Sequence, residues 1–151
     1  MTSTYDALAS YTPGATATYT RPLRDADVAL FALITGDQHP LHLDQQYASD
    51  TRFGRRVIPT ALISGIVEVA LATTIPGMQG MVRHQTLEYP ALAFIDDEIT
   101  VTITVLATNA ATATICCGIA ATNQDGALVA RGETCLAIEH LPAVTEDDAL
   151  S

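Results

Sequence analysis

The segment that decides the fold is TALISGIVEVALATT, residues 60–74. It follows Pro59, a residue type favoured near helix starts, and it is followed by the helix breakers Pro76 and Gly77. Apolar side chains recur all the way round this expected helix instead of along a single stripe. Other elements are therefore expected to cover the helix on most of its sides.

The part of the chain after this helix changes its hydrophobic period from that of a helix to that of a strand. Residues 98–106 alternate, with isoleucine and valine on one face and threonine on the other. Further strands are expected over residues 81–89, 112–122 and 127–139, with a turn at residues 124–126. An apolar helix followed by long antiparallel strands predicts an α+β fold in which the sheet curls round the helix.

The segments before the central helix predict one strand and two helical pieces. Residues 15–21 alternate as a strand does, and residues 25–35 have a helical pattern. A polar loop, residues 36–44, begins with the glycine that stops this helix, and a short helical turn over residues 45–49 follows. The apolar side of the first helix is expected to consist of Val28, Phe31, Leu33 and Ile34.

Length and charge restrict the class of protein. The chain has 151 residues and is 48% hydrophobic, which suits one domain with one sizeable core. Seven basic residues, all arginine, stand against 17 acidic ones, for a net charge of −10. Because a surface of this charge repels nucleic acid and anionic membranes, neither is expected as a partner. The apolar stretch over residues 58–75 contains Pro59 and Glu68, and we interpret it as a core helix instead of a membrane span.

The folded domain is expected to extend over residues 13–142, between a flexible segment, residues 1–12, and an acidic flexible tail, residues 143–151. The first segment lacks the basic and apolar stretches of a secretory signal. Three cysteines cannot form a closed set of disulfides, and Cys116 and Cys117, adjacent in an expected strand, point to opposite faces. The protein is therefore expected to be reduced and cytoplasmic.

The residues that could carry chemistry are concentrated in the polar loop GDQHPLHLD, residues 36–44. Asp37 and His42 lie on either side of Pro40, which fixes its own φ and lacks a donor, so both side chains can turn toward one point. A carboxylate and an imidazole directed at one water are what general acid–base catalysis needs. By spacing alone, a polar turn with capping side chains is the more common explanation.

The loop and its surroundings also resemble a known family. Residues 32–44, ALITGDQHPLHLD, with Tyr47-Ala48 and Arg52-Phe53-Gly54-Arg55 after them, are similar to the motif of the MaoC-like (R)-specific enoyl-CoA hydratases. That motif reads Gly-Asp-x-Asn-Pro-x-His, then an aromatic–Ala pair, then a Phe-Gly stretch that leads into the central helix. The similarity continues through residues 75–77 and extends, more loosely, over residues 15–140.

The resemblance implies a hotdog fold, in which an antiparallel sheet wraps a long helix, and a homodimer that covers what one sheet leaves exposed. It implies that Asp37 and His42 are the catalytic pair and hold one water. This water adds across the double bond of a 2-enoyl thioester, or is eliminated in reverse. The backbone N–H of Thr60 is the implied donor to the developing enolate oxygen. The implied substrate is an acyl thioester of CoA or of an acyl carrier protein.

Two positions depart from the family pattern. His39 stands where the motif has asparagine, and it adds a titratable group beside the pair. Pro59 and Thr60 stand where the family has a His-Gly pair, and the branched side chain of Thr60 narrows the space for a thioester. The water-handling pair is therefore expected to be intact and the acyl pocket to be altered.

Three arginines, Arg52, Arg55 and Arg56, follow the loop within five residues. They are the candidates for binding the phosphates of CoA or of a carrier protein's phosphopantetheine arm. Pairing with Asp44 and Asp50 on the surface is an equal alternative. No metal-ligand spacing and no glycine-rich phosphate loop occurs, so neither a metal nor a nucleotide cofactor is expected.

Three functions remain open at this point. The first is a lyase that hydrates an enoyl thioester or dehydrates a 3-hydroxyacyl thioester. The second is a specialised relative, in polyketide or other secondary metabolism, that uses the same pair for a cyclisation in which a substrate hydroxyl replaces water. His39 and the altered Pro59-Thr60 entrance motivate this alternative. The third is a hotdog protein that binds an acyl group without converting it.

Overall fold

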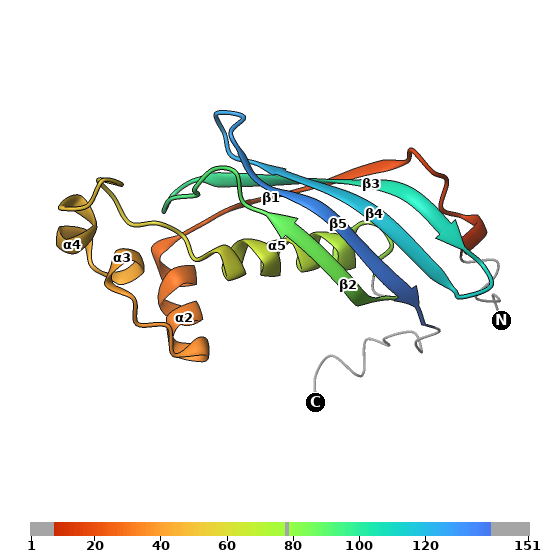
Figure 1. Cartoon of the computed structure of the whole chain (residues 1–151), viewed down its shortest axis with the longest axis horizontal. Coiled ribbons are helices and arrows are strands. Elements are labelled where there is room, and N and C mark those ends of the chain that lie inside the picture. The colour runs from red at the N-terminus through yellow and green to blue at the C-terminus, as the bar shows by residue number, and fades with distance from the viewer. Residues whose placement is uncertain (1–7, 78, 140–151) are drawn as a thin grey trace, which may run out of the picture.

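The computed structural model describes residues 8–77 and 79–139 of the chain. Within this part, five strands form one antiparallel sheet in the order β1-β3-β4-β5-β2, and helix α5, Thr60–Thr73, lies along one of its faces (Figure 1). The strands are β1 Thr16–Pro22, β2 Gly80–Glu88, β3 Glu98–Asn109, β4 Thr114–Thr122 and β5 Leu128–Ile138. The predicted α+β fold, a sheet around a central helix, is confirmed. The acidic tail, residues 143–151, lies outside the described residues.

Strand β3 shows how the alternating sequence builds this arrangement. Its buried side chains belong to the same core as those of α5, and they are Ile99, Val101, Ile103 and Val105. The threonines between them are half-buried on the opposite face. Burying one such aliphatic side chain contributes roughly 1.5–3 kcal/mol, so this face holds the sheet against the helix. After Val105 the pairing with β4 shifts in register, and the strand continues to Asn109 without a buried face.

Helix α5 is covered along one side within the described part of the chain. Its buried side chains are Ile63, Ile66, Val67, Ala70 and Leu71. Its exposed positions include Ala61, Gly65, Glu68 and Val69. The prediction that this helix is covered on most sides is therefore wrong for the single chain. The physical reason is that the sheet passes over one face of α5, while the other helices gather at one end (Figure 1).

Three shorter helices, α2 Asp25–Thr35, α3 Pro40–Leu43 and α4 Gln45–Ser49, lie together at one end of the molecule (Figure 1). Helix α2 buries Val28 and Ala32, whereas Leu33 and Ile34 are 78% and 82% exposed. The prediction that the latter two belong to the buried face is wrong, because α2 meets the rest of the chain along one narrow stripe. Among the described residues, no helix combines the length and the apolar character needed to cross a membrane.

The folded part begins before residue 13. Leu8 is buried in the core, and the hydroxyl of Tyr11 donates a hydrogen bond to the carbonyl of Pro76 at 2.6 Å. Residues 8–12, which were expected to be flexible, therefore pack against the domain. Residues 1–7 of the same segment lie outside the described ranges.

The prediction that the cysteines are reduced is wrong for two of the three. Cys116 of β4 and Cys135 of β5 form a disulfide between directly paired positions. Cys117 is free and buried on the face toward α5, so the adjacent cysteines do point to opposite faces. Burial raises the pKa of the Cys117 thiol to about 11. The disulfide depends on the register of β4 against β5, which the spacing of residues in the sequence does not specify.

Candidate active site

The candidate site begins where helix α2 ends. Gly36 is the C-cap of α2 and has the left-handed φ of 78°, which a glycine adopts without strain. The chain then turns at Asp37, whose Oδ1 accepts a hydrogen bond from the backbone N–H of His39 at 3.1 Å. This local turn holds the carboxylate in place and leaves its second oxygen, Oδ2, available to face another group.

The short helix α3 places the imidazole of His42. The helix was expected to be part of a polar loop, and it starts with Pro40, whose missing N–H is of no cost at this position. His39 is its N-cap, and its Nδ1 accepts from the backbone N–H of Leu41 at 3.1 Å. His42, one residue further along, therefore turns toward the same side as the end of α2.

The structure brings Asp37 and His42 together, as the sequence predicts. The Nε2 of His42 lies 3.9 Å from the Oδ2 of Asp37. On the other side of the ring, Nδ1 lies 2.6 Å from the carbonyl oxygen of Val57. Because a carbonyl only accepts, Nδ1 carries the proton, and in the neutral ring Nε2 keeps its lone pair. The pair thus presents a carboxylate oxygen and a basic nitrogen 3.9 Å apart, close enough for a water beside them to hydrogen-bond to both.

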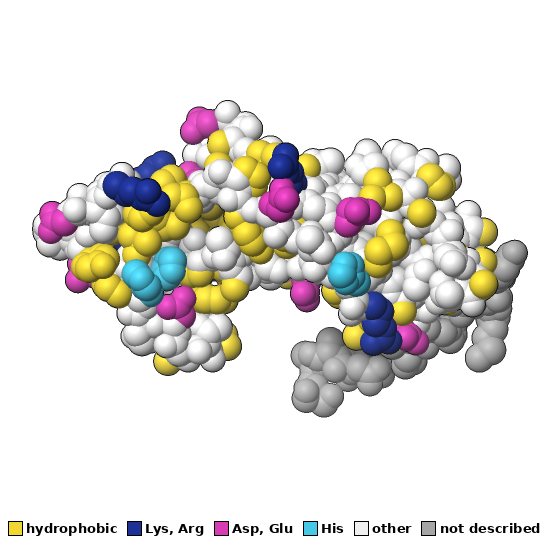
Figure 2. All heavy atoms as spheres, viewed as in Figure 1, with side chains coloured by type: hydrophobic (Ala, Val, Ile, Leu, Met, Phe, Trp, Pro, Cys, Tyr) yellow, Lys and Arg dark blue, Asp and Glu magenta, His cyan; other side chains and the backbone are white. Residues whose placement is uncertain are grey.

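Both side chains are accessible from outside while being partly enclosed. The side chain of His42 is 17% exposed and that of Asp37 is 35% exposed. Figure 2 shows imidazole and carboxylate groups next to each other on the surface of the α2–α4 end, bordered by apolar side chains. A ligand can therefore reach the pair, and part of its surroundings is apolar.

His39, the departure from the family motif, lies beside the pair. Its ring centroid is 5.5 Å from that of His42, and its ring is tilted by 53°. The Nδ1 of His39 is engaged by Leu41, so Nε2 carries the proton of the neutral ring and is the nitrogen free for a ligand. An asparagine oxygen could accept the same bond, since asparagine is a common N-cap. The helix cap is thus preserved by the histidine, and a third ionisable side chain is added.

Thr60 is the first residue of α5, as the resemblance implies for the oxyanion donor. The N-cap of α5 is Pro59, which has no side chain that could cap the helix. Among the described residues, no group accepts a hydrogen bond from the Thr60 N–H. The positive end of the helix dipole therefore remains available to an anion. Thr60 lies three positions after Val57, whose carbonyl contacts His42, so the Thr60 amide lies within about 11 Å of that carbonyl.

The three arginines differ in what their guanidinium groups contact. The guanidinium of Arg52 stacks on Phe53 at 4.8 Å, and that of Arg55 stacks on Phe94 at 3.7 Å. Stacking occupies their faces and leaves their N–H edges free for an anion. Arg56 is instead held by protein groups. At the end of the molecule that carries the paired imidazoles, Figure 2 also shows Lys or Arg side chains, and others lie elsewhere on this face.

The acidic partners that were an alternative for these arginines are used elsewhere. Asp44 caps α4 by accepting from the N–H of Tyr47 at 2.9 Å, and Asp50 accepts from the side chain of Gln46. Neither carboxylate forms an ion pair within the described ranges. The surface-pairing interpretation is therefore wrong for these two aspartates. A hollow of about 390 Å³ borders the arginines, lined by Asp25, Gln45, Arg55, Arg56, Ile95 and Asp96.

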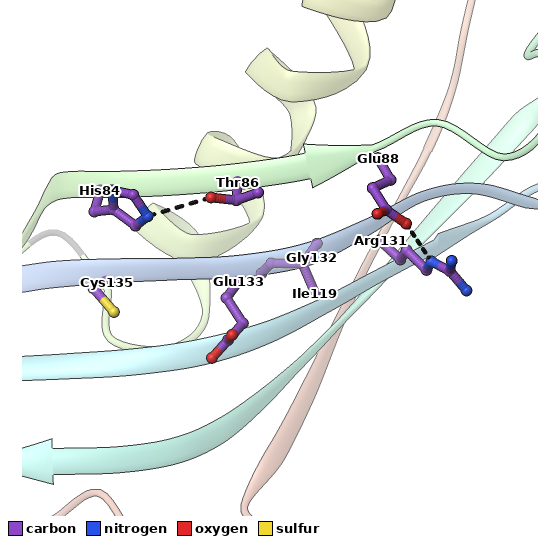
Figure 3. Close-up of a pocket in the computed structure, with 8 residues that line it drawn as sticks. All are labelled: His84, Thr86, Glu88, Ile119, Arg131, Gly132, Glu133 and Cys135. Atoms are coloured by element: carbon purple, nitrogen blue, oxygen red, sulfur yellow. Dashed lines mark hydrogen bonds and ion pairs between the residues drawn. The ribbon is translucent and has the colours of Figure 1, made fainter.

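A second hollow, of about 560 Å³, lies on the outer face of the sheet and shares no residue with this site (Figure 3). Four of its polar side chains form two pairs: Arg131 pairs with Glu88 at 2.9 Å, and Nε2 of His84 lies 3.2 Å from Thr86 Oγ1. His84 is exposed on β2. In the ranges 8–77 and 79–139, no cluster of three His, Cys, Asp or Glu side chains is arranged to hold a metal.

Two parts of the site were not found from the sequence. One is the carbonyl of Val57, which fixes the ring of His42, and the other is Arg56, whose Nε donates to the His42 carbonyl at 2.8 Å. A backbone carbonyl has no residue signature, so spacing alone cannot point to it. The contact of Arg56 with His42 was only weakly indicated by the sequence, in which an arginine lies near the loop.

A family comparison bears on this geometry. The family model described as "MaoC like domain" matches residues 10–126. The chain belongs to this family. The predicted family resemblance is confirmed, and the match includes the whole loop that carries Asp37 and His42.

Known proteins similar to this chain include hydratases. It is 34% identical over 110 residues to an (R)-specific enoyl-CoA hydratase of Aeromonas caviae, across 72% of this chain and 81% of that protein. It is 32% identical over 92 residues to a protein of the same name from Rhodospirillum rubrum, across 61% of this chain. The chain spans 64% of that relative's length, less than two thirds. The solved structure of an R-hydratase from Pseudomonas aeruginosa superposes with a TM-score of 0.83 at 28% identity, covering 91% of this chain and 94% of that one. The hotdog fold is thereby confirmed.

Proposed function

We propose that this protein is a lyase that adds water to a 2-enoyl thioester or removes it from a 3-hydroxyacyl thioester. The observation that carries the proposal is the geometry of Asp37 and His42. The Val57 carbonyl sets the tautomer of His42, so that its basic nitrogen and a carboxylate oxygen face one point. The names of similar proteins support the same reaction.

In the proposed hydration, one water bridges His42 Nε2 and Asp37 Oδ2 from the side and donates a hydrogen bond to each. As the water oxygen bonds to C3 of the enoyl group, the pair takes one of its protons, and the π electrons move onto the thioester oxygen. The N–H of Thr60 stabilises this enolate oxygen at the positive end of α5. The enolate then collapses and C2 receives a proton from the pair, which leaves a 3-hydroxyacyl thioester. Dehydration follows the same steps in reverse.

The proposed substrate carries its acyl group on CoA or on a carrier protein. Both carriers present a phosphate on a pantetheine arm. Arg52 and Arg55 follow α4 in the chain, and their N–H edges form no ion pair with any described residue. In a chain of net charge −10, a local positive surface lowers the repulsion of such an anionic ligand.

The proposed functional form is a homodimer. The exposed side of α5 carries small and apolar residues, among them Ala61, Gly65 and Val69, the last 41% exposed. The strand order leaves β1 and β2 as sheet edges. A second copy would cover apolar surface and strand edges that water otherwise reaches.

A cytoplasmic location is part of the proposal, and it bears on the redox state of Cys116 and Cys135. Disulfides are rare in a reducing cytoplasm. The disulfide between Cys116 and Cys135 is an exception to this rule, and its state in the cell therefore tests the proposed location. Trapping thiols with an alkylating reagent during cell lysis distinguishes the two states.

A cyclase is a second candidate, and the position of His39 favours it. Its Nε2–H belongs to an exposed ring 5.5 Å from that of His42 and can donate a hydrogen bond to a substrate hydroxyl, which His42 would then deprotonate in place of a water. In such a reaction the substrate oxygen adds to its own enoyl C3 and closes a ring. The binding protein without turnover has no comparable observation in its favour.

The proposed hydration is tested with trans-2-enoyl thioesters of increasing acyl length on CoA and on a carrier protein. Turnover is followed as the loss of the conjugated absorbance, and the product is identified as the 3-hydroxyacyl thioester by mass and chirality. An (R)-3-hydroxyacyl product supports the proposal. Absence of turnover with every enoyl thioester contradicts it and favours the cyclase.

A further inference from the structure

We propose that Arg56 is a positioning residue that holds His42 in its productive orientation. The inference rests on the proposed role of the Asp37–His42 pair. Arg56 differs from its neighbours Arg52 and Arg55, because its side chain is only 14% exposed and faces protein groups. Arg56 therefore supports the imidazole of His42, and it is not one of the arginines that bind the substrate.

The guanidinium of Arg56 connects two helices. Its Nε donates to the backbone carbonyl of His42, near the end of α3, at 2.8 Å. Its Nη2 forms an ion pair with Oδ1 of Asp25, the first residue of α2. Since Asp37 follows the other end of α2, the guanidinium links the start of the unit that carries Asp37 to the residue that carries the imidazole.

The neighbouring residue, Val57, adds two more contacts to the same segment. Its N–H donates to the carbonyl of Leu41 at 3.2 Å, and its carbonyl accepts from His42 Nδ1 at 2.6 Å. Arg56 and Val57 together thus hold the backbone of His42 from one side and its ring from the other. A rotation of the ring would break the bond that sets its tautomer.

This external support matters because α3 has four residues. A helix of this length is unstable by itself, since the cost of ordering its first turn is offset by very few hydrogen bonds. The position of His42 therefore depends on groups outside its own helix. Displacing a catalytic group by about 1 Å costs on the order of a hundredfold in rate.

The chemistry of the contact requires arginine. Nε and Nη2 are donors on one rigid plane, and here one of them meets a carbonyl and the other a carboxylate. A lysine ammonium on a flexible stem can satisfy one of these groups at a time and does not fix the angle between them. Lysine at this position is therefore expected to restore the charge without restoring the orientation.

The test is a comparison of kinetics with the state of the His42 ring. In Arg56→Gln, kcat for enoyl-thioester hydration is expected to fall about tenfold to a hundredfold, with KM within about twofold of wild type. Arg56→Lys is expected to recover less than half of the loss. The matched control is Arg24→Gln, which removes the exposed ion pair between Arg24 and Asp96 at the same end of the molecule, and it should retain wild-type kcat.

A double-mutant cycle isolates the connection through the guanidinium. Asp25→Ala should lower kcat by less than Arg56→Gln does, and the double variant should be no worse than Arg56→Gln alone. Additive effects of the two substitutions would overturn the inference, because they would mean that the two residues act separately.

Nitrogen NMR of the imidazole gives a readout that does not need turnover. Wild-type His42 is expected to show one tautomer with the proton on Nδ1, and Arg56→Gln is expected to show a mixture. An unchanged tautomer together with wild-type kcat in Arg56→Gln overturns the role of Arg56, while the proposed hydration stands. If the wild type hydrates no enoyl thioester, the proposed function fails, and the tautomer still decides what Arg56 does. If Arg56→Gln does not fold, Arg56→Lys replaces it, and wild-type kcat with one tautomer there overturns the inference.

Discussion

The Nδ1–H of His42 donates to the carbonyl oxygen of Val57 at 2.6 Å, across 15 positions of sequence. This bond determines which nitrogen of His42 faces Asp37. Because the carbonyl belongs to the segment that leads into α5, the same segment orients the base and begins the helix whose first N–H is free for an oxyanion. The relative placement of general base and oxyanion donor therefore depends on four residues of backbone, 57–60.

The first prediction concerns the two stacked arginines. Replacing Arg52 and Arg55 by glutamine should raise KM for a CoA or carrier-protein thioester several-fold and leave kcat nearly unchanged, because the contacts persist in ground and transition states alike. The increase should shrink as salt is added. Steady-state kinetics at low and high ionic strength measure both, with Arg24→Gln as the control. Equal KM values at low salt would exclude both arginines from substrate binding.

A second prediction separates hydration from cyclisation. His39→Asn restores the residue of the family motif and keeps an acceptor for the N–H of Leu41, so the cap of α3 is maintained. If the protein is a hydratase, this variant should keep or exceed wild-type kcat on an enoyl thioester. A loss of activity in this variant, with an unchanged melting temperature, would show that His39 has a chemical role and would favour the cyclase.

The third prediction addresses the uncovered side of α5. The mass in solution at micromolar concentration should be that of a dimer, and Val69→Glu should shift it to a monomer, because it places a charge in the apolar contact. Leu106→Glu is the matched control, since Leu106 is similarly exposed, at 45%, but lies against Gly118 on the outer face of the sheet. Analytical ultracentrifugation gives the masses. A monomeric wild type would contradict the proposed dimer.

The buried thiol of Cys117 predicts a loss of stability in alkaline solution. Burial raises its pKa from 9.0 to about 11, so the unfolded chain loses this proton at lower pH than the folded chain. The contribution is complete below pH 9.0 and is lost as pH rises to about 11, by about 2–3 kcal/mol. Urea unfolding of the wild type and of Cys117→Ala across this range measures the difference. Parallel pH curves for the two proteins would contradict the shifted pKa.

Elements with a local pattern could be predicted from the sequence. Residues 98–106 alternate as a strand does, and the segment from Thr60 has the composition and the stop signals of a buried helix. These patterns lie within each segment, so the structure of both could be predicted without knowledge of distant contacts. The convergence of Asp37 and His42 was also predictable, because a proline between them and a glycine before them restrict the loop.

Features that depend on distant contacts could not be predicted in the same way. Leu33 has the position of a core residue in its helix, yet it is exposed because none of the described elements covers that side of α2. The disulfide of Cys116 with Cys135 follows from strand register, and the role of Arg56 follows from where α2 lies relative to α3. Each of these features depends on how two elements lie relative to one another, and the hydrophobic period of a segment carries no information about that placement.

The central claim, that Asp37 and His42 act together on one water, is tested most directly by kcat in a mutant series. Asp37→Asn and His42→Ala should each lower the kcat of enoyl-thioester hydration by about 10²–10⁴-fold. The double variant should be little worse than the worse single variant, because both groups serve the same proton transfers. If either single variant retains near wild-type kcat while wild-type protein hydrates the thioester, the account of this site is contradicted.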